Sequence, residues 1–333
     1  MITIKEIAEI AGVSEGTVDR VIHDRPGVSK KTKTRISEIL KINNFQINPV
    51  GRALAIGEIK IAILIPNPQS VSGFWSLPYS GIVKHINNLS NKNIKTKFYL
   101  YDLDDEEDFI RLSNELLSYK PKGVILAPIF KRSSKIFCKK LDELKVHYFF
   151  INNHINNCNQ TSSISQNSFV AGITCAKLAS IYLKGKASSI LIASYKSNEM
   201  KIDTIKNRIE GFCHYFKNQS SNKIENKLID QSTIDSLSKK DLTKYKIIFV
   251  PSSRVGYYKK FKTKNNYIIG FDLTDTNKKL LEEGIIEAII SQEPVFQGDE
   301  IMRLAIDFIL FAKVPQKKIE SNINIFFKEN LLF

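Results

Sequence analysis

The N-terminal fold is decided by the stretch TIKEIAEIAGVSEGTVDRVI, residues 3–22. Apolar residues recur three and four positions apart on either side of Gly12-Val13, which is the spacing of one helical face. Thr3 and Glu6 can form a capping box at the start of the first helix, and Ser14 can cap the second. Two short amphipathic helices with a glycine-containing joint are typical of a helix-turn-helix, whose second helix enters the major groove of DNA.

A third helix is expected after the turn at Pro26-Gly27. Ser29 can serve as its N-cap, and Ile36, Ile39 and Leu40 form its apolar face. Three such helices can close a small core that none of them could bury alone. The pattern also fits a three-helix protein-interaction module, which is the alternative to a DNA-binding headpiece.

The order of residues in this region closely resembles the LacI/GalR family of bacterial repressors. The shared signature begins at Thr3 as Thr-x-x-x-Ile-Ala-x-x-Ala-Gly-Val-Ser-x-x-Thr-Val-x-Arg-Val. It continues as Val-Ser-x-x-Thr from Val28 and ends in the Arg-Ala-Leu-Ala of residues 52–55. Many identities at fixed spacing are far more specific than a generic helix-turn-helix pattern. The resemblance implies an all-α DNA-binding headpiece over residues 1–46 and a hinge helix or linker over residues 47–59.

The resemblance also implies which residues read base edges. The recognition helix of the family presents the two residues after its Ser and a later Arg, here Glu15, Gly16 and Arg20, and Arg20 can bond a guanine bidentately. Asp19 departs from the Ser or Ala usual in the family, and a carboxylate in the groove is repelled by phosphate unless it meets a donor such as cytosine N4. We therefore expect an operator half-site unlike the commoner ones of the family. Alternatively, Asp19 pairs with a nearby basic residue such as His23 and stabilises the helix.

The hinge is the second element that the resemblance defines. In the family, this segment becomes a short helix only on DNA, and a Leu enters the minor groove and wedges into the central base step. By position that residue is Leu54, preceded by Ala53, and unstacking the step bends the duplex toward more protein contacts. Gly51 and Gly57 flank the segment and lower its helicity, which predicts a segment that orders on binding. A plain linker is the alternative.

Local charge supports DNA binding better than total charge does. From Val28 to Arg52 there are six basic residues against one acid, Glu38, and these can meet phosphates and make binding salt-dependent. The recognition helix is expected over residues 14–22. The residues expected to contact DNA are Thr3, Ser14, Glu15, Gly16, Thr17, Asp19, Arg20, His23, Ser29, Thr32, Asn48, Gly51, Ala53 and Leu54.

The net charge of the whole chain is +15, but most of it lies outside the headpiece. Residues 1–59 hold nine Lys or Arg and seven Asp or Glu, so only +2 lies there and +13 lies in the remainder. The lysines of the remainder are scattered, which favours a solvated lysine-rich surface over a second nucleic-acid site.

Cysteine usage and hydropathy indicate a cytoplasmic protein of two or three domains. Cys138, Cys158, Cys175 and Cys213 have neither metal-ligand spacing nor a paired framework, so we expect reduced thiols. Early charges interrupt any apolar run at the N-terminus, and no stretch approaches 18 apolar residues. Neither a signal peptide nor a membrane span is therefore expected.

From Ile59 onward, apolar strands alternate with helices. This pattern predicts parallel sheets covered on both faces, arranged as two doubly wound α/β lobes with a ligand in the crevice beyond the strand ends. The expected strands are 59–65, 97–101, 123–127, 147–151, 189–193, 247–250 and 267–271. The expected helices are 78–89, 106–119, 135–144, 168–183 and 199–217, with a loop over 152–162.

This part resembles the sensor of the same family, which is like a periplasmic sugar-binding protein. The pieces that carry the resemblance are Gln166-Asn167 with Gly172, Arg208-x-x-Gly211-Phe212, Ile269-Gly270-Phe271-Asp272 and Ser291-Gln292-x-Pro294-x-x-Gln297-Gly298. The chain is expected to cross between lobes near residues 162, 291 and 322. The first lobe would then comprise 60–161 plus 292–321, and the second 162–291 plus 322–333.

The resemblance also implies a sugar pocket between the lobes. A sugar needs flat apolar faces for its C–H surfaces and polar groups for its hydroxyls. The expected ligand-binding residues are Phe74, Trp75, Asn153, Arg208, Ser252, Asp272 and Gln292. Asn153 and Ser252 follow strands and are weaker candidates than the others, as are Asn152 and Ser253. Alternatively, Trp75 is a core or interface aromatic, and Asp272 is a turn or cap residue before Thr274.

One departure concerns ligand charge. Ribose-type binders often have Asp-Arg after the third strand, whereas this chain has Pro128-Ile-Phe-Lys-Arg132. Lys131 or Arg132 could bind an anionic ligand such as a sugar phosphate or uronate, although a solvated basic loop is the simpler interpretation.

No catalytic constellation is evident. The chain has no Gly-rich phosphate loop, no HExxH and no CxxC, and its five histidines are dispersed, so we expect neither an enzyme nor a cofactor or metal site. The interpretation is a homodimeric, sugar-responsive repressor of a carbohydrate-utilisation operon that binds a pseudo-palindromic operator. The alternatives are a corepressor-type or ligand-independent regulator, a solute-binding protein, and an enzyme hidden in the two-lobed region.

Overall fold

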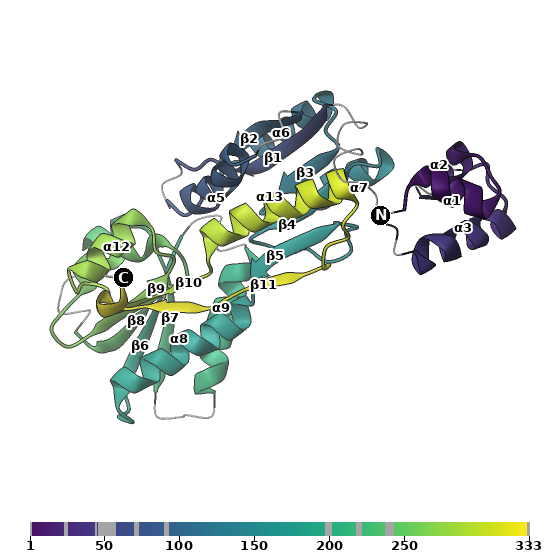
Figure 1. Cartoon of the computed structure of the whole chain (residues 1–333). Coiled ribbons are helices and arrows are strands. Elements are labelled where there is room, and N and C mark those ends of the chain that lie inside the picture. The colour runs from purple at the N-terminus through teal and green to yellow at the C-terminus, as the bar shows by residue number, and fades with distance from the viewer. Residues whose placement is uncertain are drawn as a thin grey trace. The chain divides into compact units, whose positions relative to one another are not determined.

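The chain folds into two compact units, residues 1–57 and residues 58–333 (Figure 1). The structure is a computed structural model that describes residues 2–22, 26–43, 45, 58–69, 73–89, 93–196, 202–217, 222–236 and 243–331. Each unit has its own hydrophobic core.

The described part of the first unit is helical, as expected. Its helices are α1 (Ile4–Ala11), α2 (Glu15–Ile22) and α3 (Lys30–Ile42). At the start of each helix, a hydroxyl oxygen accepts a hydrogen bond from a backbone amide. The hydroxyls are those of Thr3 before α1, Ser14 before α2 and Ser29 before α3. Glu6 completes the predicted capping box. The core is formed by Ile7, Ala8, Ala11, Val18, Val21 and Ile36, so all three helices contribute to it.

The second unit contains two six-stranded sheets with the same strand order (Figure 1). The first sheet has the order β11-β5-β4-β3-β1-β2, and the second has the order β12-β10-β9-β8-β6-β7. The first sheet comprises β1 (Ile59–Pro66), β2 (Ile94–Tyr101), β3 (Gly123–Leu126), β4 (His147–Ile151), β5 (Ser162–Gln166) and β11 (Ile319–Ser321). The second comprises β6 (Ser189–Tyr195), β7 (Lys223–Ile229), β8 (Tyr245–Phe249), β9 (Tyr267–Phe271), β10 (Ala288–Ser291) and β12 (Asn324–Phe326). The paired strands are parallel except β12, which is antiparallel to β10.

Helices cover both faces of each sheet and complete two lobes. In the first lobe, α5 (Ser76–Asn87) and α13 (Pro294–Phe311) pack together, and α6 (Glu106–Ser118) and α7 (Lys131–Glu143) cover the other face. In the second lobe, α8 (Ser168–Leu183) packs on α9 (Asp203–Phe216), and the opposite face carries η2 (Arg254–Phe261) and α12 (Asp275–Glu282). The remaining short elements are α10 (Gln231–Ser236) and η3 (Lys328–Asn330).

The boundary between the lobes differs from the expected one. β5 pairs with β4 in the first sheet, so the first lobe runs on to Gln166 and does not end at residue 161. The sequence of β5, SSISQ, has a single large apolar residue, although all five residues are buried. Because polar residues dominate this strand, its hydropathy predicts no strand, and the expected crossing near residue 162 placed all of it in the second lobe.

In each lobe, two helices pack closely against each other: α13 on α5 in the first lobe and α8 on α9 in the second. A Cβ built on Gly298 of α13 would lie 2.0 Å from the Pro78 carbonyl oxygen of α5. In the second lobe, a Cβ on Gly172 of α8 would lie 2.1 Å from the Arg208 carbonyl oxygen of α9. Glycine is therefore required at both positions, because a side chain would force the helix backbones apart.

Candidate functional site

A cavity lies between the two lobes of the second unit, at the carboxyl ends of the strands. It has a volume of about 50 Å³. The described residues that line it are Phe74, Trp75, Leu103, Ile129, Asn152, Ile202, Thr204, Ile205, Arg208, Ser252, Ser253, Asp272 and Gln292.

Six of the seven residues expected in a pocket line this cavity. Asn153 is the exception, although its Oδ1 accepts a hydrogen bond from the hydroxyl of the lining residue Thr204 in the other lobe. The weaker candidates Asn152 and Ser253 do line the cavity. The sequence interpretation missed the remaining lining residues, Leu103, Ile129, Ile202, Thr204 and Ile205.

A simple topological signal could have found two of the missed residues. Leu103 and Ile129 follow the ends of β2 and β3, and Phe74 and Trp75 also follow a strand end, that of β1. Because the carboxyl ends of parallel strands lie at one edge of a sheet, residues just after them are candidates whatever their polarity.

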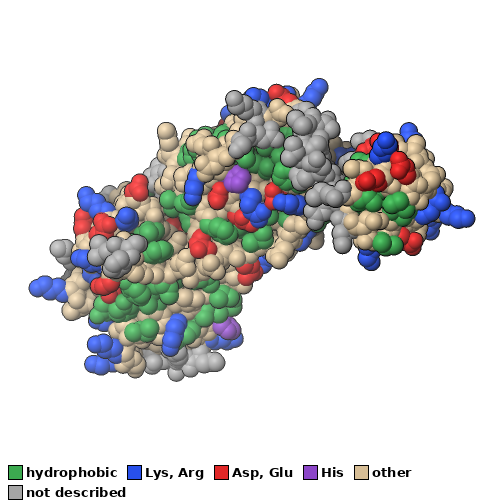
Figure 2. All heavy atoms as spheres, in the orientation of Figure 1, with side chains coloured by type: hydrophobic (Ala, Val, Ile, Leu, Met, Phe, Trp, Pro, Cys, Tyr) green, Lys and Arg blue, Asp and Glu red, His purple; other side chains and the backbone are tan. Residues whose placement is uncertain are grey.

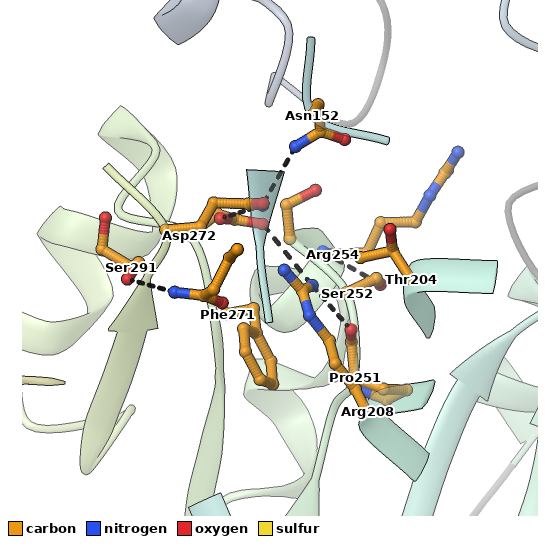
Figure 3. Close-up of polar contacts among 12 residues, drawn as sticks. Asn152, Thr204, Arg208, Pro251, Ser252, Arg254, Phe271, Asp272 and Ser291 are labelled. Carbon is orange, nitrogen blue, oxygen red and sulfur yellow. Dashed lines mark hydrogen bonds and ion pairs between the residues drawn. The ribbon is translucent and has the colours of Figure 1, made fainter. Parts of the chain in front are cut away.

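Two equivalent residues, one from each lobe, are hydrogen-bonded to Gln292 in the cavity wall, and Figure 3 labels both of them, Asn152 and Asp272. Asn152 follows β4 and Asp272 follows β9, and both have left-handed backbones, with φ of 68° and 65°. Asn152 Nδ2 donates to Gln292 Oε1 at 2.9 Å, and Gln292 Nε2 donates to Asp272 Oδ1 at 2.9 Å. Gln292 lies where the chain crosses from β10 to α13, so its amide links both lobes to a crossing segment.

Asp272 combines a side-chain role with a backbone role. Its carbonyl oxygen accepts from the amide of Thr274, and Thr274 itself caps α12. The turn expected as the alternative role is thus formed by the backbone of Asp272. Asp272 is 2% exposed, and its carboxylate faces Gln292 and Arg208 in the wall of the cavity.

Arg208 is the buried cation of the cavity. Its side chain is 2% exposed, and Nη1 donates to the Pro251 carbonyl at 3.0 Å and lies 3.9 Å from Asp272 Oδ2 (Figure 3). The guanidinium stacks on Phe271, with Cζ 3.7 Å from the ring centroid. Burial lowers the pKa of Arg208, whereas Asp272 acts in the opposite direction. Nε and Nη2 have no hydrogen-bond partner within the described chain, so two buried donors on one edge of the guanidinium are available.

The lobes also touch at the cleft edge. Lys131 Nζ at the start of α7 lies 2.9 Å from Asp203 Oδ2 at the start of α9. Both Lys131 and Arg132 are exposed and neither lines the cavity. α7 begins at Lys131, four residues earlier than expected, so these two residues belong to a helix and not to a basic loop.

Polar side chains tie the crossing segments together. Gln166 Nε2 donates to the carbonyls of Ser291 and Asn322, at 3.1 and 3.0 Å. Gln297 Nε2 donates to the carbonyl of Gln292 at 2.8 Å, and the Glu293 carboxylate accepts from the Asn322 amide. All three crossings between the lobes are therefore joined in one hydrogen-bonded group.

The helix-turn-helix unit exposes the residues expected to read DNA. Val18 and Val21 of α2 are buried, whereas Glu15, Gly16 and Arg20 are exposed. Thr17 and Thr32 are hydrogen-bonded to the caps Ser14 and Ser29. Of the other expected DNA contacts, Thr3 is exposed and Asp19 is half-buried. His23, Asn48, Gly51, Ala53 and Leu54 lie outside the described residues, and so does the alternative pair between Asp19 and His23.

Within the described ranges, His, Cys, Asp and Glu side chains form no group of three that could hold a metal ion. None of the described helices is both long enough and apolar enough to cross a membrane. On the face drawn in Figure 2, the Lys and Arg side chains of the second unit are dispersed among acidic, apolar and other groups.

Comparisons with known proteins agree with this architecture. The model of bacterial regulatory proteins of the lacI family matches residues 3–48, and a periplasmic binding protein domain matches residues 61–313. The transcriptional regulator IdnR of Escherichia coli is 32% identical over 130 residues, 38% of this chain and 36% of IdnR. MalR of Streptococcus pneumoniae is 26% identical over 125 residues, 37% of this chain and 38% of MalR. The matched part thus spans little more than a third of these relatives.

Solved structures show the same fold at low identity. A Bacteroides fragilis protein assigned as a LacI transcriptional regulator has a TM-score of 0.74 at 22% identity, covering 82% of this chain and 98% of that one. A solute-binding protein from Burkholderia graminis in complex with D-arabinose has a TM-score of 0.71 at 16% identity, covering 83% and 97%. Over residues 61–313 the chain belongs to the periplasmic binding protein domain family, and its residues 3–48 match the helix-turn-helix model of bacterial regulatory proteins of the lacI family.

Proposed function

We propose that this protein is a cytoplasmic, ligand-responsive transcriptional repressor of a carbohydrate-utilisation operon. A homodimer binds a pseudo-palindromic operator, each headpiece reads one half-site through α2, and Leu54 enters the minor groove at the centre. A sugar or sugar derivative binds between the lobes and changes operator affinity. The protein is a regulator and not an enzyme.

One observation carries the proposal: a single chain joins an exposed recognition surface to a cavity with unpartnered donors. The exposed face of α2 includes Arg20, which suits bidentate contact with a guanine. The cavity holds the two unpartnered donors of Arg208 beside the Asp272 carboxylate, a combination suited to neighbouring hydroxyls. A solute-binding protein would have no use for the first feature, and a ligand-independent regulator would have no use for the second.

The coupling between the two sites follows from the lobe contacts. A ligand that bridges Arg208 and the first-lobe wall favours one relative position of the lobes, and the crossing segments around Gln292 must adapt to it. Operator affinity then changes by the same factor as ligand affinity changes on operator, because binding coupling is reciprocal. A corepressor would make the coupling positive and an inducer would make it negative, so measuring the sign separates these two variants of the proposal.

The proposal is tested first by selecting genomic fragments with the purified full chain and sequencing them. We expect a palindromic motif upstream of transport or sugar-utilisation genes, which would also nominate ligands. If a folded dimer enriches no motif, with or without cell extract, operator-directed regulation is refuted. A motif whose occupancy responds to no sugar would instead favour the ligand-independent alternative.

The hinge role is tested by Leu54→Ala. If Leu54 wedges into a base step, the variant loses specific operator affinity by roughly ten-fold or more, while affinity for non-specific DNA changes little, because unspecific contacts use phosphates. Competitive binding to operator and scrambled duplexes at one salt concentration measures both. Equal losses on the two duplexes would show that Leu54 acts only as part of a linker.

A further inference from the structure

The two walls of the cleft cavity differ in chemistry. Among the described residues, the first lobe lines the cavity with the aromatic or aliphatic Phe74, Trp75, Leu103 and Ile129, whose one polar side-chain group is the indole N–H of Trp75, and with the amide of Asn152. Asn152 Nδ2 is already engaged by Gln292 Oε1 at 2.9 Å. A ligand hydroxyl against this wall would find few partners, and a buried hydroxyl without a partner weakens binding.

The opposite wall supplies polar groups. The second lobe contributes Thr204, Arg208, Ser252, Ser253 and Asp272, together with the apolar Ile202 and Ile205. Nε and Nη2 of Arg208 lie on one edge of a planar guanidinium, so they can donate in parallel to two neighbouring oxygens. Polar recognition is therefore concentrated on one side of the cavity.

The charged groups of the cavity balance each other. Arg208 and Asp272, 3.9 Å apart, are the charged side chains among its described lining residues. Lys131, which the sequence offered as a partner for an anionic ligand, pairs with Asp203 and is not a lining residue. An anionic ligand would place a second negative charge beside the buried Asp272 carboxylate, which is unfavourable without another cation.

On the basis of the proposed function, we infer that the effector is an uncharged carbohydrate with one deoxygenated face. Its neighbouring hydroxyls face Arg208 and Asp272, and its methyl or methylene surface faces Leu103 and Ile129. Phe74 and Trp75, whose rings meet edge-to-face at 5.3 Å, bound the same side of the cavity. Leu103 and Ile129 are thus the residues that select deoxy sugars over their hydroxylated counterparts.

Matched sugar pairs test this inference on the full chain. Isothermal titration would compare D-fucose with D-galactose, L-rhamnose with L-mannose and D-quinovose with D-glucose, and add D-glucuronate and D-glucose 6-phosphate as charged probes. We expect a deoxy sugar to bind roughly ten-fold or more tightly than its hydroxylated counterpart, because the extra hydroxyl is buried without a partner. We expect both charged probes to bind more weakly than any neutral sugar that binds.

Two variants at one position link the preference to the first-lobe wall. Ile129→Asn provides a partner for a hydroxyl and should reduce the preference several-fold or reverse it, whereas Ile129→Leu should retain it. Ile129 is only partly buried, and thermal unfolding of the unliganded variants checks that both fold. A preference that Ile129→Asn leaves unchanged would remove Ile129 from the selecting wall and contradict the inference.

The results of these titrations distinguish a failure of the deoxy-sugar inference from a failure of the proposed regulatory function. A hydroxylated or charged sugar that binds best and shifts operator affinity would overturn the inference and leave the regulator intact. Operator binding that responds to none of the sugars, with no heat of binding for any, would overturn both the sugar-responsive function and the inference.

Discussion

Asn152 in the first lobe and Asp272 in the second occupy equivalent positions, each just after the fourth strand of its sheet, and each adopts a left-handed backbone. Asn and Asp tolerate this region better than other residues with a side chain. The two lobes therefore share a left-handed residue after the fourth strand, which directs a side chain toward the cleft. They differ in that one side chain is a neutral amide and the other is a carboxylate beside Arg208.

The comparison separates two kinds of constraint. Strand order, left-handed turns and close-packed helix pairs recur in both lobes, so they serve to build a lobe. The polarity of the cavity wall differs between the two lobes, so we attribute this polarity to ligand recognition. Variants of the recurring features should damage both lobes alike, whereas variants of the differing features should change ligand response and spare the fold.

The largest expected effect comes from breaking the recurring helix contact. Gly298→Ala in the first lobe and Gly172→Ala in the second should each destabilise the second unit by about 3 kcal/mol, because each Cβ would overlap a helix carbonyl oxygen. Chemical denaturation measures both. Lys177→Ala, at an exposed position of α8, is the control and should change stability by less than about 0.5 kcal/mol. A mild effect in one lobe only would mean that the two contacts are not equivalent.

Exchanging the differing residues should have the next largest effect. In the double variant Asn152→Asp, Asp272→Asn, a flipped Gln292 amide can keep both hydrogen bonds, but Arg208 loses its neighbouring carboxylate. We expect the ligand to bind about 30-fold more weakly, equivalent to about 2 kcal/mol, because a charge-assisted partner is lost at the polar wall. Operator binding without ligand should remain. An exchange that preserves ligand affinity would show that the charge difference between the lobes has no role in recognition.

How far the sequence predicts this architecture also differs between regions. Long apolar strands and amphipathic helices, such as β1, β4 and α8, lie close to where hydropathy indicates. β5 was assigned to the wrong lobe because its burial comes from small polar residues packed between neighbouring strands. Single-chain hydropathy cannot reveal such a strand, since tertiary packing decides its burial.

The sequence predicts the lining residues of the cavity that are polar or that stand at positions known from the resembled family. It does not predict the other lining residues. Arg208, Asp272 and Gln292 line it as expected, but the apolar first-lobe wall was only half found. Leu103 and Ile129 are ordinary core residues by composition, and only the topology of strand ends places them at a cleft. The difference in polarity between the two cavity walls is consequently a property of the folded chain, and residue types alone do not predict it.

The smallest expected effect concerns the contact that links the lobes at the cleft edge. Lys131→Met removes an ion pair with Asp203 whose side chains are about half exposed, and such pairs contribute about 0.2–1 kcal/mol. We expect ligand affinity to fall less than about five-fold, and the difference from the unmodified chain to shrink at 1 M salt, where the Debye length is about 3 Å. Arg132→Met is the matched control, since Arg132 is exposed next to Lys131 and is not joined to a carboxylate by an ion pair in the described chain.

If Lys131→Met instead weakened binding by far more than Arg132→Met and the loss persisted at high salt, Lys131 would contact the ligand directly. The ligand would then be anionic, and the division into an apolar and a polar wall would no longer describe the recognition.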